Sequence, residues 1–229
     1  MIVYKYGGTT LLNEEGLLTT VRDGVRVHQK IVLIVSAIGR YPAPYSTDAL
    51  FKMCDNVSEL EKARVVSCGE VISSVYVSNL LNKNNINAIS LSIYDINLRY
   101  QDGFMVSDKI RQYLDTYDVL VIPGFIGLKD NELTLLPRGG SNITASFFAY
   151  YFGCDLVIFT DVDGLYHKDP KSNKDAKKFN SLSYENLKEL TKDNPSLFPH
   201  EGIKYLELGS VNVTIRNTCY ALGTIIRKK

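Results

Sequence analysis

The chain has 229 residues, of which 45% are hydrophobic and 22% charged, and this size and composition fit a globular protein with one large core or two small ones. Its 26 Lys and Arg residues balance 25 Asp and Glu residues, and the resulting net charge of +1 excludes the strongly basic surface of a typical nucleic-acid-binding protein. The sequence contains no apolar run long enough to span a membrane.

Apolar runs of strand length alternate with helical patterns along the whole chain. In chain order, the first part predicts a strand at Ile2–Tyr6, a helix at Asn13–Lys30, a strand at Ile31–Ser36, helices at Thr47–Asn56 and Ser58–Asn84, and a strand at Ala88–Leu91. After a loop or hairpin at Leu98–Phe104 come a helix at Ser107–Asp115, a strand at Val119–Pro123, a hairpin through Leu133–Leu136, a helix at Asn142–Phe152 and a strand at Leu156–Thr160. The rest predicts a helix near Tyr184–Leu190 and strands at Val211–Arg216 and Thr224–Arg227. This alternation is typical of an α/β fold with a largely parallel sheet.

The cysteines and the amino terminus bear on the cellular compartment. Four widely spaced cysteines without a Cys-x-x-Cys pair argue against both a zinc site and a disulfide framework. The chain opens on the strand-like run Ile2-Val3-Tyr4 rather than on a signal peptide. We therefore expect a soluble cytoplasmic protein that has neither a membrane nor a nucleic acid as its partner.

Small and polar residues follow several of the predicted strands. Five segments have this character: Lys5–Thr10, Ser36–Gly39, Pro123–Gly127, Arg138–Thr144 and Thr160–Gly164. In an open parallel sheet, ligands bind in the crevice at the carboxyl ends of the strands. Five such loops at one predicted edge are more than turn chemistry requires, and they predict a ligand site there.

The first of these loops, Lys5-Tyr6-Gly7-Gly8-Thr9-Thr10, has neither the Walker A nor the Rossmann spacing. It shares their physical basis, however, because it places exposed backbone N–H groups and one lysine near the start of a helix. A Lys5 side chain that points along the sheet edge can neutralise phosphate oxygens during their transfer. The alternative is that Lys5 is a solvated lysine at the end of a strand.

The segment Arg138–Ala145 lies between a predicted strand and a predicted helix. Its two glycines let the backbone come close to a ligand. Ser141, Asn142 and Thr144 can cap the helix, whose first N–H groups attract anions. Arg138 adds a planar, charged fork suited to carboxylate or phosphate. The alternative is a well-capped loop with a solvated arginine.

Two further segments contain carboxylates, and a third is rich in lysine. Thr160–Tyr166 brings Asp161 and Asp163 into a tight turn, which is either a ribose or magnesium contact or an ordinary Asx-rich turn. Glu70 falls at the start or inside of a long, mostly apolar helix, where a carboxylate must be paired, neutral or facing a site. The lysine-rich stretch His167–Asn180 is either a mobile surface loop or a lid over a ligand.

Taken together, these segments resemble the amino acid kinase family, and within it the aspartokinases. Six motifs carry the resemblance in the family's order: Lys5-Tyr6-Gly7-Gly8-Thr9-Thr10, Val35-Ser36-Ala37-Ile38-Gly39 with Thr47-Asp48-Ala49-Leu50, Ser67-Cys68-Gly69-Glu70, Gly124-Phe125-Ile126-Gly127, Arg138-Gly139-Gly140-Ser141, and Phe159-Thr160-Asp161-Val162-Asp163-Gly164. The resemblance extends from residue 2 to about residue 226. It implies a three-layer α-β-α sandwich with a mainly parallel central sheet.

The resemblance also implies one amino acid kinase domain over residues 1–229 and no regulatory domain. Residues 1 to about 140 would bind the acceptor, and residues from about 141 to 229 would bind the nucleotide. Aspartokinases transfer the γ-phosphoryl group of ATP to the side-chain carboxylate of aspartate. We therefore expect ATP, Mg²⁺ and an amino acid or carboxylate as the small molecules, and we expect any homodimer to form through the kinase fold.

Individual roles follow from the resemblance, residue by residue. The catalytic residues would be Lys5 and Asn142. The acceptor would be held by Thr47, Glu70, Arg138 and Ser141, with Arg138 on its α-carboxylate. The phosphates would lie on Lys5, Gly7, Gly8 and Ser36, and the rest of the nucleotide among Thr160, Asp161, Tyr166 and Lys171. Mg²⁺ would arrive with ATP, held mainly by phosphate oxygens and water rather than by protein ligands.

The chain departs from the aspartokinase pattern in three places. Asn142 stands where the family motif has an aspartate, and an amide lacks the negative charge that an ammonium group of bound aspartate favours. A gapless extension of the motifs over 184–218 puts Ser196 where aspartokinases have a lysine. The chain also stops at Lys229, about where the catalytic domain ends, so we expect no ACT domain and no feedback through one.

These departures leave three hypotheses. The leading one is a kinase that makes an acyl phosphate from L-aspartate. The second is a related kinase for a different amino acid or carboxylate, which Asn142 motivates. The third is a non-catalytic homologue that binds a nucleotide or an amino acid, which Ser196 motivates because the loss of a preorganised charge costs a phosphoryl-transfer site on the order of a hundredfold in rate.

Overall fold

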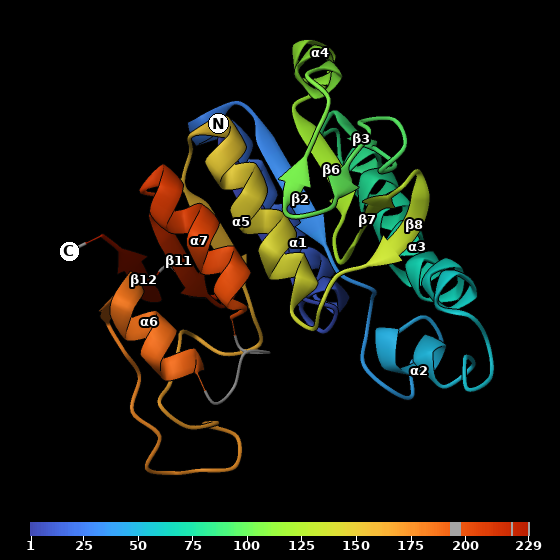
Figure 1. Ribbon diagram of the computed structural model, residues 1–229. Helices are drawn as coiled ribbons and strands as arrows, with labels where there is room; N and C mark the ends of the chain where they lie inside the picture. Colours follow the sequence, from blue (N-terminus) through green and yellow to red (C-terminus); the bar gives the residue numbers. More distant parts are fainter. Residues whose placement is uncertain (193–197, 221, 229) are drawn as a thin grey trace.

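The computed structural model describes residues 1–192, 198–220 and 222–228 (Figure 1). Within these ranges the helices are α1 (Glu14–His28), α2 (Thr47–Phe51), α3 (Glu59–Lys83), α4 (Lys109–Thr116), α5 (Gly140–Phe152), α6 (Tyr184–Thr191) and α7 (His200–Gly209), with a short 3-10 helix, η1, at Thr10–Leu12. The strands are β1 (Ile2–Tyr6), β2 (Ile31–Val35), β3 (Ala88–Ser90), β4 (Arg99–Tyr100), β5 (Phe104–Met105), β6 (Val119–Pro123), β7 (Ile126–Lys129), β8 (Glu132–Leu135), β9 (Leu156–Phe159), β10 (Ser181–Ser183), β11 (Val213–Arg216) and β12 (Thr224–Arg227).

The central sheet has the strand order β10-β12-β11-β9-β1-β2-β6-β3. Six neighbouring strands, from β11 to β3, run parallel, whereas β12 is antiparallel to β11 and β10 follows the direction of β12. The predicted α/β class with a mainly parallel sheet is therefore confirmed. No helix in the described part of the chain is both long enough and apolar enough to cross a membrane.

Side chains of the central strands alternate between two hydrophobic cores, as the two-residue period of a strand requires. In β2, residues 31, 33 and 35 face one core, and residues 32 and 34 face the other. α1 and the second half of α3 cover the first core, while α4, α5, α6 and α7 cover the second. In Figure 1, α5 and α7 lie side by side on one face of the sheet. The expected three-layer sandwich is thus present.

A second, smaller sheet has the order β5-β4-β7-β8. The expected hairpin through Leu133–Leu136 is its β7–β8 pair, in which Ile126 pairs with Leu135 and Lys129 with Glu132. The segment Leu98–Phe104, expected to be a loop or a hairpin, is a hairpin of β4 and β5. β8 packs against the first half of α3, so this long helix connects the smaller sheet to the central one.

The start of α3 is fixed by its own sequence. Ser58 accepts a hydrogen bond at Oγ from the N–H of Glu61, and the Glu61 carboxylate accepts one from the N–H of Ser58. This reciprocal capping box satisfies two of the backbone donors that every helix leaves open at its first turn. The helix then runs without interruption to Lys83, almost as expected.

Three elements differ from the expected ones. α2 ends at Phe51 instead of Asn56, because the turn residues Asp55 and Asn56 favour backbone conformations other than helix. α7 was not expected from the sequence, since two glycines weaken the helical pattern. The structure keeps this helix because Ile203 and Leu206 anchor it in the second core. The short strand β10 was also not expected.

The loop after β1 packs directly on the loop after β2. The Gly8 carbonyl accepts a hydrogen bond of 2.9 Å from the N–H of Gly39. A Cβ atom on Gly8 would lie 2.2 Å from the carbonyl oxygen of Ala37 and 2.6 Å from that of Gly39. Neither backbone atom can move aside as a side chain can, so only glycine fits here. At Gly7, by contrast, a Cβ atom would meet nothing closer than 3.7 Å.

This contrast gives a matched pair of variants for a test of the loop packing. We expect Gly8→Ala to lower the free energy of unfolding by about 2 kcal/mol, because the added methyl group forces the two loops apart. Gly7→Ala is expected to change it by less than about 1 kcal/mol. Urea unfolding of both variants measures the difference. Equal effects of the two substitutions would show that the loops are not packed as described.

Candidate active site

The loops that follow β9, β1, β2 and β6 meet at the carboxyl edge of the central sheet. These four strands are neighbours and run parallel, so their carboxyl ends lie at the same edge. The fifth predicted segment joins them through a hydrogen bond of 3.0 Å between the hydroxyl groups of Ser36 and Ser141. All five loops that the sequence singled out therefore lie at one edge.

A cavity of about 300 Å³ opens between the carboxyl ends of β1, β2 and β6 and the helices α2, α3 and α5. Its lining consists of Lys5, Ser36, Thr47, Asp48, Phe51, Glu70, Phe125, Arg138, Gly139, Gly140, Ser141 and Asn142. The structure thus brings together all of the expected acceptor residues, together with Lys5, Ser36 and Asn142. It also adds three residues that the sequence reasoning did not propose for the site, namely Asp48, Phe51 and Phe125.

Lys5 occupies an unusual position for a lysine. It lies in β1 and shares the face of that strand with Val3, which belongs to the core beneath α5. Burial lowers the pKa of its ammonium group to about 8, and the negative charge of Glu70 opposes that shift. Because Lys5 is only partly exposed and lines the cavity, the structure favours a lysine of the site over a merely solvated one, and its role stays a prediction.

Glu70 is only 1% exposed and lies in the middle of α3. Burial raises the pKa of its carboxyl group to about 8, while the backbone N–H of Ala37 and the charge of Lys5 act in the opposite direction. Its Oε2 atom has no hydrogen-bond partner among the described residues. A buried oxygen without a partner is costly, and here it lines a cavity that a ligand can enter.

The neighbour of Glu70, Gly69, explains how the carboxyl group reaches the cavity. A Cβ atom on Gly69 would lie 2.5 Å from the carbonyl oxygen of Tyr45 and 2.9 Å from the side chain of Ala37. The bare backbone therefore lets α3 come into contact with the loop between β2 and α2. The side chain one residue further on then points into the site rather than into solvent.

Contacts around β6 fix the position of Ser141 in the same way. Gly124 follows β6, and its N–H donates a hydrogen bond of 2.9 Å to the carbonyl of Val35. A Cβ atom there would lie 2.8 Å from that of Ser141. The absence of a side chain at Gly124 thus makes room for Ser141, and the two serine hydroxyl groups meet across this gap.

The start of α5 differs from the expected one. Ser141, Asn142 and Thr144 were expected to cap the helix, but α5 begins at Gly140 and no side chain caps it. Gly139 takes the cap position in the left-handed conformation, with φ of 80°, which glycine adopts without strain. The three polar residues therefore lie inside the first turns of the helix, and Ser141 faces the cavity instead of the helix end.

Arg138 lies at the mouth of the cavity, with its side chain 85% exposed. Its guanidinium group is 3.8 Å from the carboxylate of Asp48, the second residue of α2. Such an exposed pair contributes little to stability. It does bring the guanidinium group to the same wall as Thr47, so the expected acceptor residues from α2 and from the glycine loop face one space.

The residues expected around the nucleotide lie beyond the acceptor cavity, after β9. Lys171 forms an ion pair with Asp161, and this charge and hydrogen bond outweigh the effect of burial, so the pKa of Asp161 lies below its ordinary value. Tyr166 donates a hydrogen bond of 2.5 Å to Asp163, which also pairs with Lys178 at 2.8 Å. Thr160, Asp161 and Lys171 are therefore joined to one another, whereas Tyr166 belongs to a second group with Asp163 and Lys178.

Backbone contacts hold the two ends of the stretch His167–Asn180. The N–H of His167 donates to the carbonyl of Lys177 at 3.2 Å, and the N–H of Phe179 donates to the carbonyl of Leu165 at 2.9 Å. The ends of this segment are therefore paired across its base. Whether its tip is mobile or closes over a ligand stays a prediction.

Gly7 and Gly8 belong to the loop between this group and the acceptor cavity. The N–H of Gly7 donates a hydrogen bond of 3.4 Å to the carbonyl of Phe159, the last residue of β9. The position that a Cβ atom would take on Gly7 is 3.7 Å from the Lys5 ammonium nitrogen. Bare backbone and a lysine ammonium group thus meet where β1 ends.

The structure gives no protein cage for a metal ion in residues 1–192, 198–220 and 222–228, where no three His, Cys, Asp or Glu side chains are close enough to hold one. Ser196, at the position of the expected lysine, lies outside the described residues.

Comparison with known proteins gives the family. The model of the "Amino acid kinase family" matches residues 1–217. The chain is 27% identical over 240 residues to aspartokinase 1 of Bacillus subtilis strain 168, covering 95% of this chain and 58% of that protein. It is 31% identical over 243 residues to the aspartokinase of Helicobacter pylori strain J99, covering 99% of this chain and 59% of that protein. The chain therefore spans less than two thirds of the length of these relatives.

Among solved structures, the fold matches that of E. coli aspartokinase III in complex with aspartate and ADP. The TM-score is 0.81, with 18% identity, and the match covers 100% of this chain and 65% of that one. At this level of identity the likeness concerns the fold alone.

The buried carboxyl group leads to a testable pH dependence of stability. The folded-state pKa of Glu70, about 8, lies above its ordinary value of 4.5. Its contribution to stability is therefore present below pH 4.5 and is lost as the pH rises through 8. Glu70→Gln has no carboxyl group to ionise at this position, so the variant does not lose this stability as the pH rises. We expect the stability of the variant relative to the wild type to rise between about pH 5 and pH 8 in urea unfolding.

The exposed residue Glu132 provides the control, because Glu132→Gln removes a carboxylate that is not buried. This variant is expected to follow the wild type across the same pH range. A constant stability difference between Glu70→Gln and the wild type would contradict the assignment of Glu70 as a desolvated carboxyl group.

Proposed function

Because the chain belongs to the amino acid kinase family, we propose that it transfers the γ-phosphoryl group of ATP to the side-chain carboxylate of L-aspartate. The observation that carries this proposal is the cavity in which the desolvated Lys5 ammonium group, the buried Glu70 carboxyl group and the Arg138 guanidinium group face one space. The similarity to proteins named aspartokinases supports the choice of acceptor.

The acceptor half of the site suits an amino acid. An incoming ammonium group would give the unpartnered oxygen of Glu70 a hydrogen bond and a positive charge, both of which favour the ionised carboxylate. Arg138 presents two parallel donors to a carboxylate at the cavity mouth. The hydroxyl groups of Thr47 and Ser141 add neutral contacts between these two charged ends.

The nucleotide half begins at Lys5. Phosphate oxygens near its ammonium group would restore the charged form, because a negative charge raises the pKa of a lysine that burial has lowered. Gly7 leaves the backbone bare beside that ammonium group, so a phosphate can approach closely. Mg²⁺, held by phosphate oxygens and water, would neutralise further negative charge on the phosphates. Thr160, Asp161, Tyr166 and Lys171 would surround the rest of the nucleotide.

The proposed reaction needs no covalent enzyme intermediate. A carboxylate oxygen of the acceptor forms a bond to the γ-phosphorus, the bond from that phosphorus to the β,γ-bridging oxygen breaks, and ADP leaves. The carboxylate is already deprotonated, so no general base is required. The site contributes by positioning and by neutralising charge. Lys5 acts on the transferring oxygens, and the Asn142 amide can donate a hydrogen bond to them.

The division into an acceptor part, residues 1 to about 140, and a nucleotide part from about 141 stays a prediction, and in this proposal Lys5 and Gly7 of the first part also serve the nucleotide while Ser141 of the second serves the acceptor. A second candidate function is a kinase for another carboxylate. Asn142 favours it, since this position lines the acceptor cavity with a neutral amide. The homodimer and the cytoplasmic location stay predictions.

The direct test is the release of ADP from MgATP with L-aspartate, L-glutamate and L-malate as acceptors. We expect L-aspartate to have the highest kcat/KM of the three. If L-glutamate or L-malate exceeds it tenfold, which equals about 1.4 kcal/mol of transition-state stabilisation, the second candidate replaces the first. If no acid stimulates ADP release although nucleotide binds, the protein is a non-catalytic homologue.

Lys5→Met tests the role of the buried ammonium group. We expect kcat to fall by about a hundredfold or more, because the variant loses a preorganised charge from the transferring phosphoryl group. Lys30→Met is the matched control: Lys30 precedes β2 at the opposite edge of the sheet and pairs with Asp118 at 3.1 Å. The assignment fails if the two variants keep the same kcat.

A further inference from the structure

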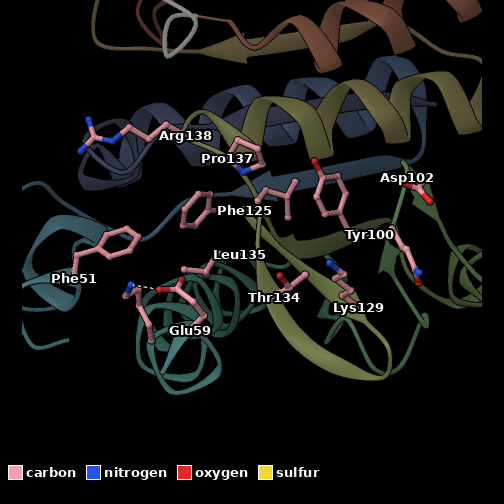
Figure 2. A pocket seen from close by; sticks show the side chains of 13 residues that line it. Phe51, Glu59, Tyr100, Asp102, Phe125, Lys129, Thr134, Leu135, Pro137 and Arg138 are labelled. Carbon is pink, nitrogen blue, oxygen red and sulfur yellow. Dashed lines mark hydrogen bonds and ion pairs between the residues drawn. The ribbon is translucent and has the colours of Figure 1, made fainter. Parts of the chain in front are cut away.

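The acceptor cavity has an open end and an enclosed end. At the open end it meets a groove of about 690 Å³ along the β7–β8 hairpin, and Phe51, Phe125 and Arg138 line both spaces (Figure 2). Glu70 lines the cavity but not the groove, and it is buried. The position of its carboxyl group therefore depends on the backbone packed against it rather than on the open end of the cavity.

The loop after β2, residues Ser36–Gly39, is the backbone packed against Glu70. Each of its four N–H groups has an acceptor, and those at the two ends are bound by the backbone of β1 and of the loop after it. The N–H of Ser36 donates a hydrogen bond of 3.2 Å to the carbonyl of Tyr6, and the N–H of Gly39 donates one of 2.9 Å to the carbonyl of Gly8. The loop is thus attached to the nucleotide half of the site at both ends.

The two middle N–H groups of this loop are bound by side chains of α3. The N–H of Ile38 donates a hydrogen bond of 2.8 Å to the hydroxyl oxygen of Ser73. The N–H of Ala37 interacts with the carboxyl group of Glu70 and favours its charged form. Glu70 and Ser73 are three residues apart, so they lie on the same face of the helix. One turn of α3 therefore holds two consecutive peptide groups of the loop.

The Ser73 hydroxyl group is fixed by the helix that carries it. Ser73 is fully buried, and its hydroxyl donates a hydrogen bond of 2.8 Å to the carbonyl of Gly69. Because a hydroxyl group has one hydrogen and two lone pairs, its oxygen is still free to accept from the Ile38 N–H. Ser73 does not line the cavity. It can therefore act on the site only through the loop that it holds.

A displaced loop would disturb the acceptor half of the site in two places. The Ala37 N–H would withdraw from Glu70. The Ser36 hydroxyl would lose its hydrogen bond of 3.0 Å to that of Ser141. The bond from Gly39 to Gly8 does not involve α3, so the nucleotide end of the loop would keep its attachment.

We propose that Ser73 is a positioning residue for the acceptor: its hydroxyl holds the loop Ser36–Gly39 on α3, which keeps the Ala37 N–H on the Glu70 carboxyl group and leaves the unpartnered Oε2 atom of that group for the ammonium group of the acceptor. This inference rests on the proposed kinase function. It adds a residue outside the cavity to the group that determines acceptor affinity.

The Glu70 carboxyl group provides a readout that a merely structural role of Ser73 would not move. The charged side chains that line the cavity with Glu70 come from three other segments: Lys5 of β1, Asp48 of α2 and Arg138 before α5. Ser73→Ala removes none of these charges. The Ala37 N–H acts to lower the pKa of Glu70, so its withdrawal raises that pKa further.

The experiment measures ADP release from MgATP and L-aspartate together with NMR titration of ¹³C-labelled glutamate side chains. In Ser73→Ala we expect the KM for L-aspartate to rise about fivefold and the KM for MgATP to change less than twofold. The glutamate signal that titrates near pH 8 in the wild type and is absent in Glu70→Gln should move to higher pH in this variant.

Ser74→Ala is the matched control. Ser74 is the next residue of α3 and is equally buried, but its hydroxyl bonds the carbonyl of Val71 and the hydroxyl of Ser90, each at 2.9 Å, rather than the loop. This variant should lose a similar amount of stability in urea unfolding while both KM values and the Glu70 signal stay at their wild-type values.

Two further substitutions at position 73 separate positioning from packing. Ser73→Thr keeps the hydroxyl group and is expected to restore the KM for L-aspartate and the Glu70 signal, even where its added methyl group lowers stability. Ser73→Cys fills the space with a weak acceptor and should shift both values in the direction of Ser73→Ala. It also replaces that variant in the test if Ser73→Ala does not fold.

The outcomes separate this inference from the proposed function. If Ser73→Ala lowers stability but changes neither the KM for L-aspartate nor the Glu70 signal, or if Ser74→Ala changes them equally, the positioning role is overturned and the kinase function stands. If the wild type turns over no acceptor, the kinase function fails and the NMR titration decides the rest. An upward shift of the Glu70 signal in Ser73→Ala that Ser73→Thr reverses then supports the role of Ser73, and an unchanged signal overturns it.

Discussion

The site depends on two ionisable groups that lie together at the carboxyl edge of a parallel sheet, the buried carboxyl group of Glu70 and the partly buried ammonium group of Lys5. Burial lowers the pKa of Lys5 to about 8 and raises the pKa of Glu70 to about 8. Both groups therefore change their charge near the same, mildly alkaline pH. Such an arrangement costs stability in the free protein. A phosphate near the ammonium group and a cation near the carboxyl group would offset this cost. The same desolvation that destabilises the empty site therefore favours ligands of complementary charge.

Close backbone contacts make this arrangement rigid. Gly8 lies against the loop after β2, Gly69 lets α3 reach the same loop, and Gly124 makes room for Ser141. Each contact joins two segments that are distant in the chain, so the position of one charged group depends on the others. The cavity is consequently built from the carboxyl ends of β1, β2 and β6, the loop before α5, and the helices α2, α3 and α5, and the groove lies beside it along the β7–β8 hairpin.

Sequence patterns predicted the part of the site that local chemistry determines. A lysine before two glycines at a strand end and a lone glutamate in an apolar helix marked Lys5 and Glu70 as candidates, and only the resemblance to the aspartokinases gave them roles. The patterns did not predict Phe51 or Phe125 as cavity walls, because the inward position of Phe51 depends on where a five-residue helix is packed, and that of Phe125 on a backbone φ of 62°. Capping of α5 was predicted wrongly because the helix begins at Gly140 rather than Asn142, with Gly139 in the left-handed conformation before it, so that Ser141, Asn142 and Thr144 lie inside its first turns.

The central claim, that the site contains a desolvated lysine beside a buried carboxyl group, is tested most directly by NMR titration of ¹³C-labelled lysine side chains. One lysine signal is expected to titrate near pH 8, to be absent in Lys5→Met, and to titrate at a lower pH in Glu70→Gln, where the carboxylate charge is lost. Addition of MgATP should move the midpoint of this signal upward. A spectrum in which no lysine titrates near pH 8, or in which that signal persists in Lys5→Met, would contradict the account.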